Sequence, residues 1–166
     1  ILIEPVESEA VTLALATGPD LIVLGGDYVT HGNRHFVEPV AELLAPLHAP
    51  LGIFAILGNH DDDREVPASL RSQRIQVLRD DRTRLEYKAQ GLELAGISFW
   101  TRDRRKIADH VKGARGPVLL LAHDPRRLID ASKLNIAAVL SGHTHGGQIV
   151  LPGVGAIAAR KFPVAA

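Results

Sequence analysis

Residues 53–61 read Ile-Phe-Ala-Ile-Leu-Gly-Asn-His-Asp, an apolar run that ends on polar, chemically active side chains. The run is too short for a typical helix and shows no polar alternation, which is typical of a strand buried on both faces. Three further runs have the same character, over residues 21–24, 118–122 and 136–140. Between the first two runs, apolar residues at helical spacing from Phe36 to Leu47 predict a helix. Alternating strands and helices indicate an α/β fold with a largely parallel sheet.

Other segments complete this organisation. We expect further helices over Val6–Ala16, Asp103–Val111 and Arg126–Lys133. The segment 74–100 breaks the rhythm, because short β-prone runs alternate there with turn residues, and it predicts hairpins that add a second sheet. No repeat, low-complexity tract or linker interrupts the chain, so we expect residues 1–166 to form a single domain.

The composition excludes several classes of protein. The chain has 166 residues, with 19 basic and 19 acidic side chains and a pI near 7.3. This balance argues against a protein that depends on nucleic-acid phosphates, so no nucleic-acid partner is expected. No stretch approaches the roughly 18 consecutive apolar residues of a membrane span. The chain has no cysteine, so any metal must be held by histidine, aspartate, glutamate or asparagine.

Each of the four apolar runs is followed by a residue that can bind a metal ion. Asp27 follows the first run, Asn59 the second, His123 the third, and His143 and His145 the fourth. Ligand-binding loops of open α/β sheets gather at the carboxyl ends of the strands, so we expect these side chains to converge. Such oxygen and imidazole ligands suit manganese, iron or zinc, and a carboxylate can bridge two ions about 3.5–4 Å apart. The sequence therefore predicts a two-metal hydrolytic centre.

These motifs resemble the calcineurin-like metallophosphoesterase family. In family order they are Gly26-Asp27, Gly58-Asn59-His60-Asp61, His123 and Gly142-His143-Thr144-His145, within residues 21–148. The extension Gly146-Gly147-Gln148 with Leu151-Pro152-Gly153 is most similar to a bacterial, often membrane-associated phosphodiesterase branch that includes UDP-2,3-diacylglucosamine hydrolases. The resemblance implies a four-layer αββα sandwich and a binuclear metal-dependent phosphohydrolase.

The resemblance also implies a set of metal ligands. Asp27 would bridge two divalent ions, which would be manganese, iron or zinc. Asn59, His123 and His143 would complete the site of one ion, and His145 would belong to the other. We expect the ion position that lacks His145 to be the better formed of the two.

Three further residues receive roles in catalysis or substrate binding. By resemblance, His60 would contact the scissile phosphate and donate a proton to the leaving oxygen. Asp61 would be its partner, orienting the ring and raising its pKa. His31 follows the first motif closely enough to border the site and is a further candidate for substrate contact.

The sequence departs from the family pattern at both ends. The family's first motif, an Asp-x-His after its first strand, has no counterpart, since no histidine precedes His31. The strands that usually follow the last motif have no counterpart after Phe162. The resemblance thus describes a domain incomplete at both ends, and we expect the full protein to be longer, with an Asp-x-His upstream of Glu4.

The implied reaction is hydrolysis of a phosphomonoester, phosphodiester or pyrophosphate bond by a hydroxide that two metal ions activate. The expected partner is a phosphate-ester substrate, with nucleotide-lipids and phospholipids as candidates. The expected location is cytoplasmic or peripheral to a membrane. The alternative is a degenerate member of the fold that serves as a binding scaffold, which only the missing motif favours. The basic run of Arg102, Arg104, Arg105 and Lys106 is either a solvated face or a contact for phosphate or an anionic lipid.

Overall fold

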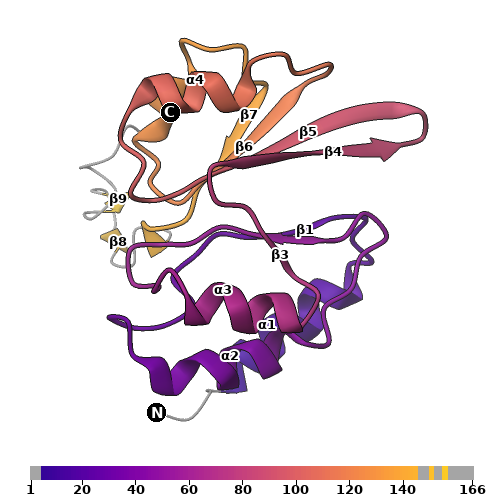
Figure 1. The fold of residues 1–166 in the computed structure, drawn as a ribbon. Helices are drawn as coiled ribbons and strands as arrows, with labels where there is room; N and C mark the ends of the chain where they lie inside the picture. The colour runs from indigo at the N-terminus through magenta and orange to yellow at the C-terminus, as the bar shows by residue number, and fades with distance from the viewer. Residues whose placement is uncertain (1–4, 146–149, 152–154, 157–166) are drawn as a thin grey trace.

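A computed structural model describes residues 5–145, 150–151 and 155–156, and their strands form three sheets (Figure 1). The first sheet is parallel, with the order β1 (Ile22–Leu24), β2 (Ile53–Ala55) and β3 (Gln76–Val77). The second sheet has the order β4 (Asp81–Tyr87), β5 (Gln90–Ile97), β6 (Val118–Ala122) and β7 (Ala138–Leu140). Its β4–β5 pair is antiparallel and its other pairs are parallel. Finally, β8 (Val150–Leu151) and β9 (Gly155–Ala156) form an antiparallel pair.

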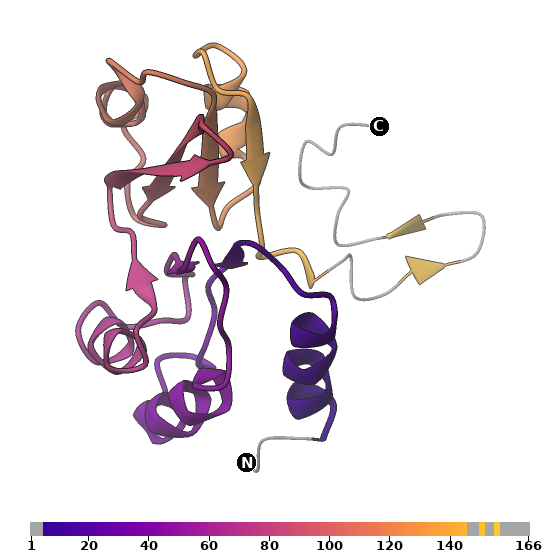
Figure 2. The same cartoon turned by 90° about the vertical axis from the view of Figure 1, so that its right-hand side faces the viewer.

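The helices lie on the outer faces of the two large sheets (Figures 1 and 2). The first sheet is covered by α1 (Pro5–Ala16), α2 (Val37–Leu44) with the preceding 3-10 turn η1 (Arg34–Phe36), and α3 (Glu65–Ser72). The second sheet is covered by α4 (Arg104–Val111) and α5 (Arg127–Ala131). No helix among the described residues is long and apolar enough to cross a membrane.

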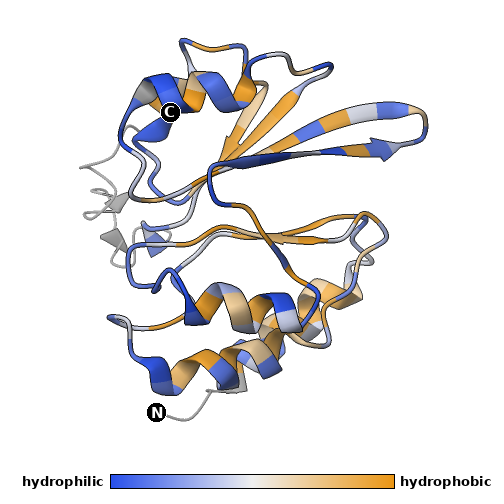
Figure 3. Ribbon diagram, in the orientation of Figure 1, coloured by the Kyte–Doolittle hydropathy of each residue, from blue (hydrophilic) through white to orange (hydrophobic). Residues whose placement is uncertain are grey.

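Alternation along the strands builds three apolar layers. Within β2, Ile53 and Ala55 pack in the cluster that contains the helical residue Leu70, whereas Phe54 belongs to the cluster between the sheets. Phe54 meets Leu94 of β5 in that central layer. Figure 3 shows β1, β2, β6 and β7 as largely apolar, whereas β4 is mostly hydrophilic and β5 is mixed. The order of layers is helix, sheet, sheet, helix, which confirms the predicted αββα sandwich.

The distribution of strands between the sheets differs from the expectation. The runs 21–24 and 53–57 supply β1 and β2 of one sheet, whereas 118–122 and 136–140 supply β6 and β7 of the other. The expectation that β3 adds to the second sheet is wrong, because it pairs in parallel with β2. A strand that is covered on both faces is apolar in either sheet, so the composition of a run does not reveal which sheet it joins.

One helix has no counterpart in the sequence-based expectation. The structure forms α3 over Glu65–Ser72, where Pro67 interrupts the helical pattern of the sequence. Proline is tolerated in the first turn, because the backbone N–H groups there have no intrahelical partner. This helix buries Val66 and Leu70 against the first sheet and begins shortly after the Asn59-His60-Asp61 motif.

Candidate metal centre

The loops that follow β1, β2, β6 and β7 meet where the two sheets come together. A Cβ atom added at Gly25, after β1, would lie 3.7 Å from the Cα atom of Gly142, after β7. The carbonyl oxygen of Gly25 lies 2.6 Å from Nδ1 of His123, which follows β6. The backbone N–H of His60, after β2, donates to Oδ1 of Asp27 over 2.9 Å. The structure thus brings all four motif-bearing loops to one place.

The carboxylate of Asp61 fastens the loop after β2 to the loop after β1. Its Oδ2 atom accepts the backbone N–H groups of Asp27 and Gly58, both at 2.8 Å. Its Oδ1 atom accepts those of Tyr28 at 2.7 Å and Val29 at 3.3 Å. Burial raises the pKa of Asp61, and the four backbone donors oppose that rise without cancelling it. Asp61 therefore acts as a structural clamp beneath the site.

Asp27 is held in an unusual backbone conformation that turns its side chain toward the other loops. Its φ angle is 63°, in the left-handed region, which asparagine and aspartate tolerate better than most residues. Oδ1 accepts the His60 N–H, and Oδ2 lies 3.1 Å from Nε2 of His123. Burial alone would raise the pKa of Asp27, but the hydrogen bonds with His123 and the His60 backbone outweigh it, so the pKa is lowered. Asp27 is therefore poised to remain an anion.

His123 has the clearest geometry of a metal ligand. Its side chain is 1% exposed, and Nδ1 lies 2.6 Å from the Gly25 carbonyl oxygen, which requires a proton on Nδ1. In the neutral ring Nε2 then carries a lone pair, yet it faces Oδ2 of Asp27 at 3.1 Å and Oδ1 of Asn59 at 3.2 Å. The lone pairs of His123 Nε2, Asp27 Oδ2 and Asn59 Oδ1 repel one another unless a proton or a cation lies between them. The residues present therefore fit a metal ion.

The titration of His123 reflects the same neighbours. Burial by itself lowers the pKa of this imidazole, but the hydrogen bond with the Asp27 carboxylate and the Gly25 carbonyl raise it above the ordinary value. The negative charge of Asp27 favours a proton on His123, and a bound metal cation would take the place of that proton.

His143 completes a three-residue cluster. Atoms of Asp27, His123 and His143 that can bind a metal all lie within 4.8 Å of one another. The rings of His123 and His143 are 5.0 Å apart, and burial together with the neighbouring His123 lowers the pKa of His143. A lowered pKa keeps the imidazole neutral, which is the form that binds metals.

His145 lies at the edge of the same site. It lines a cavity of about 300 Å³ together with Asp27, His123 and His143. Its side chain is exposed, and it stands outside the cluster whose potential ligand atoms lie within 4.8 Å of one another. Both His143 and His145 have positive φ angles, 67° and 50°, so the backbone is tightly coiled where these two side chains leave it.

His60 and His31 lie together beside this cluster. The backbone N–H of His31 donates to Nδ1 of His60 over 3.1 Å, and the two rings meet edge to face with their centroids 4.5 Å apart. Asp61 was expected to orient the His60 ring; in the structure both Asp61 oxygens accept backbone N–H groups, and the His31 backbone N–H meets the ring. The spacing of the motif does not reveal whether Asp61 accepts from a histidine ring or from backbone N–H groups, because a carboxylate can do either.

An aromatic residue outside the motifs also borders the centre. The ring of Phe99, which follows β5, lies 5.8 Å from the ring of His123 and 6.0 Å from that of His143, measured between centroids. Its apolar surface shields the two imidazoles on one side. The sequence offered no signal for it, because an aromatic residue after a strand is most often part of the core.

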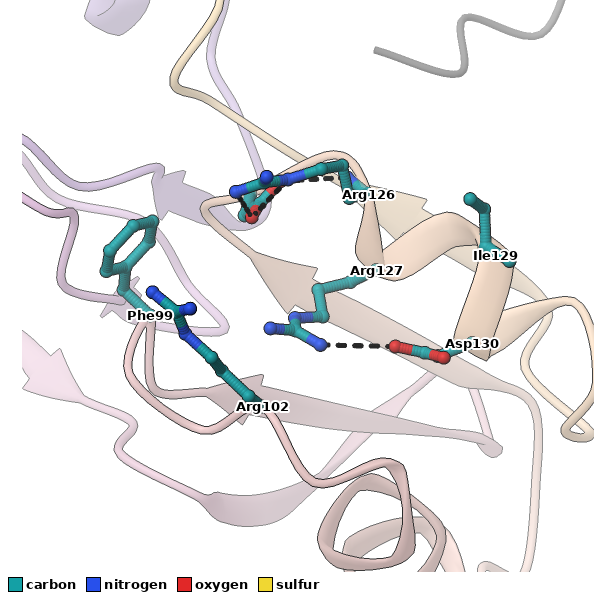
Figure 4. A pocket seen from close by; sticks show the side chains of 7 residues that line it. Phe99, Arg102, Arg126, Arg127, Ile129 and Asp130 are labelled. Atoms are coloured by element: carbon teal, nitrogen blue, oxygen red, sulfur yellow. Dashed lines mark hydrogen bonds and ion pairs between the residues drawn. The ribbon is translucent and has the colours of Figure 1, made fainter. Parts of the chain in front are cut away.

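Phe99 also lines a second cavity, which we name the arginine cavity (Figure 4). It measures about 340 Å³, and its lining consists of Phe99, Arg102, Asp124, Arg126, Arg127, Ile129 and Asp130. Among the side chains of the basic run that the structure describes, Arg102 lines it. The run His123-Asp124-Pro125-Arg126-Arg127 supplies three more lining residues, and of this run only His123 was predicted to belong to the site.

Comparisons with known proteins give this geometry a context. The chain is 32% identical over 155 residues to phosphodiesterase YaeI of Escherichia coli, covering 89% of this chain and 57% of that protein. It is 35% identical over 146 residues to an uncharacterised metallophosphoesterase of Aquifex aeolicus, covering 81% and 54%. Bacillus subtilis YkoQ, also named as an uncharacterised metallophosphoesterase, is 30% identical over 142 residues, covering 80% and 52%.

The chain spans about half the length of the curated relatives it matches. The calcineurin-like phosphoesterase family model matches residues 8–147, which include all four motif-bearing loops. On this match, and on the agreement of the relatives, the chain belongs to the calcineurin-like phosphoesterase family.

Proposed function

We propose that this protein hydrolyses a phosphodiester bond and that it depends on divalent metal ions. The observation that carries the proposal is the convergence of Asp27 Oδ2 and Asn59 Oδ1 on Nε2 of His123. The phosphodiesterase name of the Escherichia coli relative supports a diester over a monoester.

Asp27, Asn59, His123 and His143 would hold the better-formed metal position, and His145 would contribute to a second. Divalent ions bound there supply Lewis-acid activation of the phosphoryl group and of the attacking water. Oxygen and imidazole ligands suit manganese, iron or zinc. The Asp61 clamp and the Gly25 carbonyl keep the ligand atoms in register before any ion binds.

His60 is the proton donor in this proposal. Because its Nδ1 accepts the N–H of His31, the neutral ring carries its proton on Nε2 and can donate a hydrogen bond from that atom to the leaving oxygen. It becomes a proton donor when Nδ1 takes up a second proton and gives up the His31 contact, and after transfer from Nε2 the ring is neutral again. The ring is half-buried, and its own backbone N–H donates to Asp27, so it stands beside the ligands without being needed as one. The exposed His31, in contact with the His60 ring, is a candidate to contact the substrate.

The finer assignments belong to the same proposal. The candidate substrates are nucleotide-lipids and phospholipids, and such a substrate would suit a protein attached peripherally to a membrane. Residues 1–166 would be part of one catalytic domain. The alternative, a binding scaffold without catalysis, is disfavoured by the four hydrogen bonds that Asp61 accepts. These hydrogen bonds fix the backbone at Asp27 and Gly58, and a protein that only binds a partner would not need its candidate metal ligands held in this way.

The test measures hydrolysis of bis(p-nitrophenyl) phosphate, a diester, and of p-nitrophenyl phosphate, a monoester, by the full-length protein. Each assay is run after loading with Mn²⁺, Fe²⁺ or Zn²⁺, after chelation, and after the metal is restored. We expect the diester to be the better substrate, with activity lost on chelation and regained on reloading. Hydrolysis that persists after complete removal of the metals, or none with any metal, would contradict the proposal.

A further inference from the structure

The arginine cavity adjoins the metal centre through two of its lining residues. Asp124 directly follows the ligand His123, and the Phe99 ring contacts the rings of both His123 and His143. A molecule bound at the metal centre that extends past Phe99 would therefore enter this cavity. The cavity lies next to the candidate active site but contains none of its metal ligands.

Two of the arginines are fixed in place by aspartates. Asp124, whose side chain is 5% exposed, accepts from Nε of Arg126 at 2.8 and 2.9 Å and from Nη2 at 2.6 Å. Nη1 of Arg127 donates to Oδ2 of Asp130 over 3.1 Å, and the Arg127 side chain is 14% exposed. These pairs hold the guanidinium planes in a defined orientation at the cavity wall.

The charges of the lining leave a positive excess. Three arginines face two aspartates, and both aspartates are engaged with Arg126 and Arg127. Among the described residues, Arg102 has no hydrogen bond or ion pair. Figure 4 shows its guanidinium group beside Phe99, directed into the same space as that of Arg127. Two like charges that approach each other across a cavity favour an anion between them.

We propose that the arginine cavity binds a second phosphoryl group of the substrate, one that is not cleaved, while the scissile phosphate lies at the metal centre. This inference rests on the proposed function and narrows its substrate class. The substrate would be a phosphodiester or pyrophosphate that carries an additional terminal phosphate. Guanidinium groups bind phosphate oxygens through paired N–H donors, and Arg102 and Arg127 supply such donors from two different elements of the chain.

The first experiment measures binding without hydrolysis. The full-length protein loaded with Mn²⁺ is titrated calorimetrically with thymidine 3′,5′-bisphosphate and with thymidine 5′-phosphate, so that in both compounds the 5′-phosphate can lie at the metal centre. We expect the bisphosphate to bind about tenfold more tightly, the effect of one charge-assisted hydrogen bond. Arg102→Gln and Arg127→Gln should each remove most of that difference. The control is Arg105→Gln, because Arg105 belongs to the same basic run but is 92% exposed and does not line the cavity.

The second experiment compares two chromogenic diesters with the metal-loaded enzyme. They are thymidine 5′-(p-nitrophenyl phosphate) with and without a 3′-phosphate, and the proposal predicts a higher kcat/KM for the 3′-phosphorylated compound. Arg102→Gln should reduce that preference about tenfold, whereas the control Arg105→Gln should keep it. Because the Arg102 side chain is exposed, this substitution should not affect folding.

A lipid headgroup can carry the same additional phosphate as a nucleotide. Co-sedimentation with phosphatidylcholine vesicles containing phosphatidylinositol 4-phosphate or phosphatidylinositol separates these sources. A preference for the 4-phosphate lipid that Arg102→Gln removes assigns the cavity to a lipid substrate, and a preference confined to the thymidine compounds assigns it to a soluble one.

The two proposals fail in different ways. Equal binding of the two thymidine phosphates, together with equal binding of the two vesicles, would overturn the role of the arginine cavity even if hydrolysis occurs. Failure to hydrolyse either diester with any metal would overturn the proposed function, while the binding experiment would still test the cavity.

Discussion

The loops after β1 and β2 are joined by several backbone hydrogen bonds to one carboxylate, whereas Gly142 in the loop after β7 packs closely against Gly25. Asp61 alone accepts four backbone N–H groups across the first pair of loops. Gly142, by contrast, lies close to Gly25, and the exposed His145 is at the edge of the cavity. The difference indicates that backbone hydrogen bonds to one carboxylate fix the loop carrying Asp27 against the loop carrying Asn59, whereas close approach of two glycines sets the distance of the loop carrying His143.

The largest effect on catalysis is expected from His60→Ala. The variant should lower turnover of the diester by about 10²–10⁴, the usual contribution of general acid catalysis, because it removes the proposed proton donor. Metal content should stay near that of the wild type, since the His60 ring meets His31 and is not among the clustered ligands. A variant that loses its metal ions along with its activity would show that His60 is a ligand.

Breaking the link between the joined loops should cost folding stability. Asp61→Asn places an amide N–H₂ group against backbone N–H donors, so the free energy of unfolding should fall by about 2–4 kcal/mol in denaturant titrations. Asp62→Asn is the matched control. Its Oδ1 accepts the N–H groups of Arg64 and Glu65, and asparagine keeps that acceptor. Equal losses in both variants would show that Asp61 is no special clamp.

Packing of the β7 loop should be sensitive to a single methyl group. In Gly142→Ala the added Cβ would lie 2.9 Å from the Gly25 oxygen and 3.3 Å from Nδ1 of His123. We expect a loss of about 1–3 kcal/mol in stability, as for other overpacked sites, together with weaker metal binding. Gly25→Ala is the control, because its Cβ would meet no atom closer than 3.7 Å. Unchanged metal affinity in Gly142→Ala would mean that the two loops are not coupled.

A buried carboxylate far from the motifs should show a smaller, pH-dependent effect. Glu93 of β5 accepts from the Arg115 backbone and pairs with Arg82 and Arg84. Burial would raise its pKa, but these partners outweigh burial, so the pKa of Glu93 is lowered. An acid whose pKa is lower in the folded state stabilises the fold above its unfolded pKa, and this contribution is lost as pH falls through the folded pKa.

The expected difference in unfolding free energy between the wild type and Glu93→Gln is about 1–2 kcal/mol at neutral pH. It should shrink as the pH falls from about 5 to about 3, the range in which glutamate becomes protonated. Asp61, whose pKa is raised and whose partners are backbone groups, should not show this pattern. A difference for Glu93→Gln that is constant with pH would contradict the ion-pair interpretation.

The sequence predicted the elements that carry the site better than their arrangement. Continuous apolar runs located β1, β2, β6 and β7, and the residues after each run do meet. The split of these strands between two sheets was not predictable, because each run is covered on both faces in either arrangement. The hydrogen bonds of Asp61 and the place of Arg102 beside Arg127 in the arginine cavity depend on how distant parts of the chain meet, which neither spacing nor residue type reveals.

The central claim is that Asp27 is the anionic ligand around which the metal centre forms. Metal content per chain, measured by mass spectrometry after dialysis against Mn²⁺ or Zn²⁺, tests it most directly in the full-length wild type, Asp27→Asn and His110→Ala. His110 is a suitable control because it lies on α4, outside the clustered ligands. We expect bound metal in the wild type and in His110→Ala and its loss in Asp27→Asn, whereas equal metal content in all three proteins would show that Asp27 is not required for metal binding.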